Sequence, residues 1–354
     1  MKIGILTFHR AHNYGAVLQA YALQESIRKL GHDVVIIDYR QPYNEQVYAV
    51  DFEWRLFFRN LIHLKRRKVF NYIKDKHFKL HRSLIFWKFR KEYLNIEIKK
   101  DGGFPRCDRY IVGSDQVWSF HCTNGYDPIL WGEFPRPNES KLYGFSISSN
   151  GDFFNYMTNE KIVSRMEAFT DISFRESSIS ELILAKTGIR KQITLDPTIL
   201  TKASDWEKLI DRKWSKKDYI VIYNIRNFTN MPYFYELANR IIKDTKIEII
   251  DLSLMDYSVV DFVSAIKYAR CVLTSSFHAT VFSVIMDTPF YSVKFNDGHD
   301  GRYVDFLSSL KLEEHIISLN TEKDEILKFD VDQILINLEE LKKESINYLS
   351  KVVS

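Results

Sequence analysis

The segment from Cys271 to Phe282 combines a short strand, two serines and a histidine in an order that could hold an anion. Its first residues, CVLT, are apolar, whereas the apolar side chains from Phe277 onwards have helical spacing. His278 therefore lies where a strand leads into a helix. The first N–H groups of a helix lack partners, Ser275 and Ser276 can cap it, and the helix dipole favours negative charge. We expect a phosphate or a carboxylate to bind at this corner.

A second polar loop, FHRAHNYGA, stands between the first predicted strand and the first predicted helix. Its side chains His9, His12, Asn13 and Tyr14 offer hydrogen bonds to a ligand. Asn13 and Gly15 also suit a tight turn, so the loop could serve the turn alone. The loop is not the G-x-G-x-x-G of dinucleotide-binding folds and the chain has no P-loop, which argues against NAD.

Two further pairs of polar residues follow predicted strands. Arg175 could hold a phosphate through two parallel hydrogen bonds, which lysine cannot, or it could form a solvated ion pair with Glu176. Asp115 and Gln116, in VGSDQVWS, could face a sugar, although Asp115 could equally cap a helix.

The composition predicts a globular protein of two ordinary domains. The chain has 354 residues, of which 45% are hydrophobic. No apolar run approaches the roughly eighteen residues of a membrane span, and the first residues already have the pattern of a core strand, so we expect no signal peptide. The three cysteines are widely separated, which favours a reducing compartment and argues against a zinc site. We expect a cytoplasmic protein without a metal.

Positive charge is concentrated in one segment. Residues Arg59 to Lys91 contain twelve lysines and arginines against one acid, Asp75. Interleaved aromatic residues would suit nucleic acid, but the apolar residues form an imperfect helical stripe that is more typical of packing than of base stacking. We therefore expect no nucleic-acid partner. The segment is either a solvated basic face or a peripheral contact with an anionic membrane that carries a lipid-linked saccharide.

The order of strand-like and helix-like segments predicts an α/β fold of two doubly wound, Rossmann-like domains that face each other across a cleft. We place an N-terminal domain at residues 1–196, with the basic segment as a helical insertion at about 53–93. A C-terminal domain follows at 197–330, and a last helix at 331–354 is expected to pack back on the first domain. Ligands should bind at the carboxyl ends of the strands, where the polar loops fall.

Several segments, taken in order, resemble the polysaccharide pyruvyl transferases. They are KIGILTFHRAHNYGAVLQAYALQ, IVGSDQVW, SFRESS, LDPTIL and FVSAIKYARCVLTSSFHATVFSVIMDTPF. The resemblance implies a fold like that of the GT-B glycosyltransferases. It also implies transfer of a pyruvyl group from phosphoenolpyruvate to two hydroxyls of a sugar, free or lipid-linked, in a surface polysaccharide precursor. The product would be a cyclic ketal, and phosphoenolpyruvate would be a substrate, with no cofactor required.

The resemblance also assigns roles to individual residues. Arg175 and His278 match the phosphoenolpyruvate-binding arginine and histidine of the family. We expect the C-terminal domain to be the donor side and the N-terminal domain the acceptor side. Some members have an arginine where this chain has Ser276, and we expect Arg302 to supply the missing charge. His278 would then bind the phosphate or transfer a proton, and Asp115 or Glu176 would act as the base.

An alternative function uses the same scaffold. A helix amino terminus binds a diphosphate as readily as a phosphate, so a GT-B-type glycosyltransferase that uses a nucleotide sugar is the second hypothesis.

Overall fold

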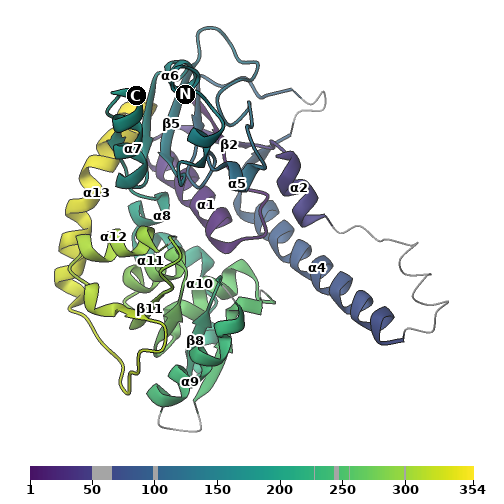
Figure 1. Cartoon of the computed structure of the whole chain (residues 1–354), viewed down its shortest axis with the longest axis vertical. Coiled ribbons are helices and arrows are strands. Elements are labelled where there is room, and N and C mark those ends of the chain that lie inside the picture. Colours follow the sequence, from purple (N-terminus) through teal and green to yellow (C-terminus); the bar gives the residue numbers. More distant parts are fainter. Residues whose placement is uncertain (50–65, 99–102, 227, 243–246, 255, 299) are drawn as a thin grey trace.

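The computed structural model describes residues 1–49, 66–98, 103–226, 228–242, 247–254, 256–298 and 300–354. Two sheets form two α/β domains (Figure 1). The strand order is β3-β2-β1-β4-β5-β6-β7 in the first sheet and β12-β11-β10-β8-β9 in the second. Neighbouring strands are parallel in both sheets. The predicted fold of two doubly wound domains is therefore confirmed.

The first sheet has helices against both faces. Its strands are β1 (Lys2–Leu6), β2 (Asp33–Ile37), β3 (Ile96–Glu97), β4 (Arg109–Val112), β5 (Lys141–Ile147), β6 (Asp171–Phe174) and β7 (Gln192–Ile193). Its helices are α1 (Tyr14–Lys29), α2 (Pro42–Tyr48), α4 (Arg66–Tyr93), α5 (Phe120–Thr123), α6 (Asn159–Glu167) and α7 (Ser177–Thr187), with a 3-10 turn η1 (Asp152–Asn155). Successive side chains of a strand enter opposite cores, so Ile3 and Ile5 pack on one face and Leu6 on the other.

The second sheet is smaller and is reached through α8 (Pro197–Leu200) and the 3-10 helices η2 (Ala203–Leu209) and η3 (Arg212–Lys216). Its strands are β8 (Tyr219–Tyr223), β9 (Glu248–Asp251), β10 (Val272–Thr274), β11 (Phe290–Lys294) and β12 (Ile316–Ser318). Its helices are α9 (Met231–Ile242), α10 (Val259–Tyr268), α11 (Phe277–Ile285) and α12 (Gly301–Ser309), with 3-10 turns η4 (Phe228–Asn230), η5 (Leu252–Leu254) and η6 (Glu313–His315).

The last helix, α13 (Val331–Val353), runs along both domains (Figure 1). Ser345 Oγ accepts a hydrogen bond from the Leu195 N–H at 2.9 Å. The Tyr348 hydroxyl donates to the carbonyl of Gly144 in β5 at 3.4 Å. The C-terminal helix thus fastens the end of the second domain to the first.

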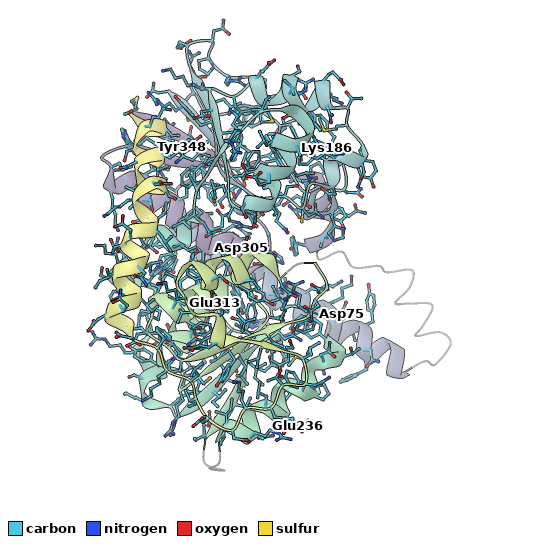
Figure 2. The ribbon with its side chains drawn as sticks, turned by 60° about the vertical axis from the view of Figure 1, so that its left-hand side comes forward. Asp75, Lys186, Glu236, Asp305, Glu313 and Tyr348 are labelled. Atoms are coloured by element: carbon cyan, nitrogen blue, oxygen red, sulfur yellow. The ribbon has the colours of Figure 1, made fainter. Side chains whose placement is uncertain are left out.

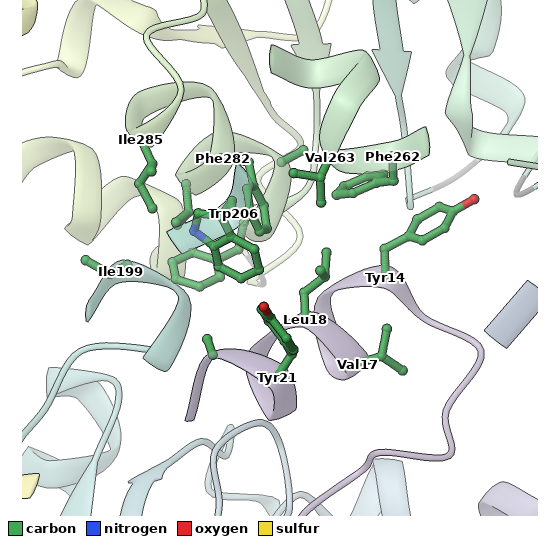
Figure 3. Packing of buried hydrophobic residues seen from close by; sticks show 14 of the residues in the cluster. Tyr14, Val17, Leu18, Tyr21, Ile199, Trp206, Phe262, Val263, Phe282 and Ile285 are labelled. Carbon is green, nitrogen blue, oxygen red and sulfur yellow. The ribbon is translucent and has the colours of Figure 1, made fainter. Parts of the chain in front are cut away.

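A hydrophobic cluster continues from one domain into the other (Figure 3). Tyr14 and Tyr21 of α1 pack against residues of the second domain, and the ring centroids of Tyr14 and Phe262 are 4.4 Å apart. Trp206 lies between Tyr21 and Phe282, with ring centroids 5.6 and 4.7 Å away. A continuous apolar contact of this kind favours one fixed arrangement of the two domains.

Helix α4 stands apart from the rest of the first domain. Ile85, Phe86 and Phe89 near its C-terminal end are buried, whereas its other end projects from the body of the molecule (Figure 1). The start of the predicted insertion at about residue 53, and residues 59–65 of the basic segment, lie outside the described residues. Within the described ranges, no helix combines the length and apolar character that crossing a bilayer requires.

Candidate functional site

A cavity of about 320 Å³ lies between the two domains. The first domain contributes the loop before α1 together with α2 and α5, and the second contributes the start of α11. Apolar side chains such as Phe8 share its wall with polar ones. Its predicted site residues are Asn13, Asp115, Gln116, Ser276, His278 and Arg302.

A second cavity, of about 170 Å³, adjoins the first. Arg175, Glu176 and Asp196 line it from the first domain. Phe277 and Arg302 line both cavities, so they form the boundary between them. The predicted site residues are therefore divided between two neighbouring spaces.

The strand-to-helix corner has the local structure that the sequence predicts. Strand β10 ends at Thr274, and α11 begins at Phe277 with Ser276 as its N-cap, whose Oγ accepts from the Ala279 N–H at 3.4 Å. Ser276 lines the larger cavity. Ser275 points elsewhere, because its Oγ donates to Asn224 Oδ1 at 2.8 Å. Ser275 thus shapes the corner, while Ser276 borders the ligand space.

His278 is held at the contact between the domains. A Cβ atom at position 15 of α1 would overlap the imidazole ring, so only glycine there allows α1 to lie against it. His278 Nε2 is buried, has no hydrogen-bond partner within the described ranges, and lies 3.6 Å from Asp196 Oδ2. A buried polar atom without a partner is uncommon in a folded protein. Here the nearest charged group is the Asp196 carboxylate, which lies within ion-pair distance.

Asp196 connects the histidine to Arg175. Its Oδ2 accepts from Arg175 Nη1 at 2.7 Å, and its Oδ1 accepts from the N–H and Oγ1 of Thr198 at 2.9 and 2.6 Å. Burial alone would raise the pKa of this carboxyl, but His278, Arg175 and Thr198 hold it well below its usual range. Asp196 is therefore an ionised acid at the centre of the site. The sequence indicated only an aspartate before a proline at a helix start, which suggests a cap and no more.

Arg175 is fully engaged by its neighbours. Besides Asp196, its Nε donates to Glu176 Oε1 at 3.0 Å and its Nη2 donates to Ser148 Oγ at 2.8 Å. Burial alone would lower the pKa of Arg175, but Glu176 and Asp196 raise it above its usual range. The Arg175 guanidinium thus forms ion pairs with two carboxylates, those of Glu176 and Asp196. Glu176 Oε2 is buried and has no hydrogen-bond partner in the described part of the chain.

Arg302, near the start of α12, has the opposite character. Among the residues that the structure describes, it forms no hydrogen bond or ion pair, and it borders both cavities. Burial lowers the pKa of Arg302, and the nearby charge of Arg175 lowers it further. Arg302 is only partly exposed, and the carboxylates of Glu176 and Asp115 act on it without a hydrogen bond. Such a guanidinium can form charge-assisted hydrogen bonds to an anionic ligand.

Asp115 follows β4 in an unusual backbone conformation. Its φ is +76°, and Gly113 before it has a φ of +120°. Non-glycine residues rarely adopt such angles, and those that do often lie at functional sites. The Asp115 Oδ1 accepts from the Gln116 N–H at 2.9 Å, and Gln116 Oε1 accepts from the thiol of Cys122 at 3.4 Å. Both side chains border the larger cavity.

Of the four polar residues predicted to bind a ligand in the loop before α1, only Asn13 lines the larger cavity. Asn13 borders it and caps α1, accepting from the Ala16 N–H at 3.2 Å. The Tyr14 hydroxyl instead donates to the Tyr257 carbonyl at 2.6 Å, within the contact between the domains. His9 lies within ion-pair distance of Asp38, 3.1 Å away.

His12 also lies outside both cavities. Its ring stacks on Phe86 of α4, with the centroids 5.4 Å apart. Burial, assisted by the charges of Arg90 and Arg82, lowers its pKa to about 4, so the ring is neutral at physiological pH. His12 therefore precedes a cavity residue, Asn13, in the chain but does not itself line the cavity.

Other lining residues had no recognisable signal in the sequence. Tyr43, Asn44 and Tyr48 come from α2, and His121 and Cys122 come from α5. Neither helix carries a motif, and only the tertiary fold brings them to the cavity. Burial, together with the charge of Asp115, raises the pKa of the Cys122 thiol to about 11, which makes it a poor nucleophile.

A family model described as polysaccharide pyruvyl transferase matches residues 13–296, a span that contains both cavities' candidate residues from Asn13 to His278. The chain belongs to the polysaccharide pyruvyl transferase family. It is therefore a transferase, with a pyruvyl donor and a saccharide acceptor. No curated protein matches the chain.

Three solved structures that this pyruvyl transferase resembles share little sequence with it. A UDP-N-acetylglucosamine 2-epimerase described as putative, from Listeria monocytogenes, is 9% identical, with a TM-score of 0.47 over 99% of this chain and 91% of that one. The S. aureus MnaA structure with UDP is 10% identical, with a TM-score of 0.46 over 99% and 91%. The E. coli heptosyltransferase WaaC with ADP is 11% identical, with a TM-score of 0.40 over 96% and 100%.

The geometry of this pyruvyl transferase separates two kinds of group. Arg302 and Ser276, the N-cap of α11, border the larger cavity, whereas Arg175 is hydrogen-bonded to both Asp196 and Ser148 and His278 lies within ion-pair distance of Asp196. The site therefore combines a buried charged network with a guanidinium, that of Arg302, which has no hydrogen-bond partner among the described residues.

Proposed function

We propose that this enzyme transfers the pyruvyl group of phosphoenolpyruvate to two hydroxyls of a sugar and forms a cyclic ketal. The observation that carries this proposal is the unpaired guanidinium of Arg302 at the boundary of the two cavities. Phosphoenolpyruvate has a carboxylate and a phosphate. Arg302, His278 and the N–H groups at the start of α11 offer three separate positive or donor groups to them.

The reaction needs one proton delivered and two removed. The methylene carbon of phosphoenolpyruvate takes a proton, and a sugar hydroxyl then attacks the cationic carbon and loses its own proton. Phosphate leaves with the bonding electron pair, and the second hydroxyl closes the ketal and loses its proton. We assign the proton delivery to His278, which borders the larger cavity and lies within ion-pair distance of Asp196. Asp115, whose side chain borders the larger cavity, is the proposed base on the acceptor side, with Glu176 as the second candidate.

The larger cavity is the proposed acceptor site. Its aromatic side chains Tyr43 and Tyr48, together with Asn13 and Gln116, give the mixture of apolar faces and hydrogen-bonding groups that suits a sugar ring. The acceptor would belong to a surface polysaccharide precursor in the cytoplasm. A lipid-linked precursor would hold the enzyme at the inner face of the membrane, through the basic segment 59–91. The donor serves as a substrate, and we propose no metal, no further cofactor and no nucleic-acid partner.

Thermal unfolding with added ligands tests the donor. Phosphoenolpyruvate should raise the unfolding temperature of the wild type, because it binds only the folded state. It should not do so for His278→Ala or Arg302→Gln, and both variants should lose phosphate release with a sugar acceptor. Stabilisation by UDP or GDP but not by phosphoenolpyruvate would instead support a nucleotide-sugar glycosyltransferase.

A further inference from the structure

Helix α4 has two apolar faces, and only one of them packs against the residues that the structure describes. Ile85, Phe86 and Phe89 are buried, and the centroid of Phe86 lies 5.4 Å from that of Tyr14. The opposite face holds an apolar stripe that is exposed, and four of its residues, Ile73, Leu80, Leu84 and Trp87, belong to the stripe whose spacing is typical of packing. The stripe comprises Phe70, Ile73, Leu80, Leu84 and Trp87, with relative exposures of 67%, 49%, 49%, 46% and 48%.

The spacing of this stripe is regular. The residues lie three and four apart once His77 is included, which places all six on one side of a helix. In Figure 1 the N-terminal part of α4 projects away from both domains, and in Figure 2 the labelled Asp75 lies on this projecting part. The stripe is thus an exposed, largely apolar surface whose N-terminal part projects from the body of the molecule. A surface of this kind marks an interaction site.

The charge beside the stripe is strongly positive. Helix α4 carries ten lysines and arginines against two acids, Asp75 and Glu92. Lys74, Lys76 and Lys88 occupy helical positions on either side of the stripe, and the Lys91 ammonium lies 5.0 Å from the centre of the Trp87 ring. Lysines at these positions can keep their charged ends among polar groups, such as lipid headgroups, while the apolar stripe enters an apolar layer.

These charges decide which partner fits. A second copy of α4 packed on the stripe would bring lysines against lysines in either orientation, and like charges in that position oppose pairing. An anionic lipid surface attracts the same lysines and accepts the aromatic and aliphatic stripe at its acyl boundary. We infer that this face of α4 lies in the interface of an anionic membrane, with its stripe inserted among the lipids.

This inference extends the proposed membrane location, which rests on charge, to insertion of named apolar residues. It does not depend on which donor the enzyme uses. The buried face of α4 contacts the acceptor side, since Arg82 Nη2 donates to the His12 carbonyl at 2.5 Å and His12 precedes Asn13 of the larger cavity. A membrane under α4 would therefore hold a lipid-linked sugar near the proposed acceptor site.

Sedimentation of the full-length protein with lipid vesicles tests the inference. The vesicles contain phosphatidylcholine alone or phosphatidylcholine with phosphatidylglycerol. The wild type should bind only the anionic vesicles. Two triple variants should weaken binding, by at least tenfold when the stripe is truncated and by about a hundredfold when three charges are removed. They are Phe70→Ala with Ile73→Ala and Leu80→Ala, and Lys74→Gln with Lys76→Gln and Lys88→Gln.

Matched variants on other surfaces control for hydrophobicity and net charge. They replace exposed residues elsewhere: Leu254→Ala with Leu335→Ala and Ile336→Ala, and Lys186→Gln with Lys216→Gln and Lys328→Gln. Both should bind vesicles as the wild type does, and all variants should keep the wild-type unfolding temperature within a few degrees. Stabilisation by phosphoenolpyruvate, measured in parallel, reports on the donor site separately.

Three results would overturn the inference. The wild type could fail to sediment with anionic vesicles, or truncating the stripe could leave binding unchanged. Alternatively, light scattering could show a wild-type dimer that the stripe variant dissociates, in which case the occupant of the stripe is a second copy of the chain.

Discussion

Arg175 and Arg302 border the same small cavity, yet their surroundings are opposite. Arg175 has two carboxylates and a hydroxyl within hydrogen-bond distance. Arg302 has none among the described residues, and burial lowers its pKa. A buried ion-pair network holds its members in place, whereas a guanidinium without a hydrogen-bonded partner can bind an anionic ligand through charge-assisted bonds. We propose that Arg175 shapes the site and that Arg302 supplies charge for an anion.

The largest effect should come from Arg302→Gln. Removing this guanidinium takes away charge-assisted hydrogen bonds of about 1.5–3 kcal/mol each, so phosphoenolpyruvate-dependent phosphate release should fall at least a hundredfold. The unfolding temperature without ligand should stay the same or rise, because no protein partner is lost. Steady-state phosphate release and thermal unfolding measure the two effects.

Arg302→Lys separates charge from geometry. Lysine keeps the charge but loses the planar fork, so it should recover part of the activity and leave the Michaelis constant for phosphoenolpyruvate raised. Equal activity of the wild type and Arg302→Gln would show that the anion does not bind at Arg302. The difference between the surroundings of Arg175 and Arg302 would then not be related to catalysis.

The next largest effect should be on stability, from Asp196→Asn. The variant leaves Arg175 with one carboxylate and removes the charge nearest to His278, which should cost about 3 kcal/mol of unfolding free energy at neutral pH. The wild-type carboxyl has a pKa below its usual range, so its contribution is complete above about pH 5. It decreases as the pH falls below about 4. Chemical denaturation at pH 7 and at pH 3.5 should therefore show a smaller difference between the two proteins at the lower pH.

The sequence predicts the parts of this site that depend on local signals. The Ser276 cap and the apolar spacing after Phe277 placed the start of α11 correctly, because a helix start depends on neighbouring residues. Resemblance to one family indicated Arg175 and His278, and the missing arginine at position 276 drew attention to Arg302. The two sheets followed from the alternation of strands and helices.

Other features depend on contacts between segments far apart in the chain. The sequence gives no reason why Asp196 should meet both Arg175 and His278, or why Tyr14 should leave the ligand space for the domain contact. The apolar stripe of α4 has the same spacing whether it is buried or exposed. Only the position of α4 relative to the body decides between them.

Gly15→Ala should have an intermediate effect through the position of His278. The new methyl group overlaps the imidazole ring, so either the ring turns or the domains move apart. We expect phosphate release to fall about tenfold and stability to fall by about 1–3 kcal/mol, the usual cost of overpacking. Gly301→Ala is the matched control, because no atom of the described residues lies within 4 Å of its Cβ position, and it should change neither quantity. Unchanged activity of Gly15→Ala would mean that the position of His278 is not critical.

The smallest effect should come from His12→Phe. This variant extends the comparison of the two arginines to a buried side chain that is neutral at physiological pH. His12 lies beside Arg82 and Arg90, and burial with these charges lowers its pKa to about 4. The folded state therefore resists protonation of His12, whereas the unfolded chain takes up the proton near pH 6.5. The unfolding free energy of the wild type therefore has its full value above that pH and decreases as the pH falls towards 4. Phenylalanine keeps the stacking on Phe86 but cannot be protonated. The variant should match the wild type at pH 7.5 in stability and in phosphate release, and should be more stable by about 1–2 kcal/mol at pH 4.5. A loss of phosphate release at pH 7.5 would show instead that His12 contributes to the ligand site.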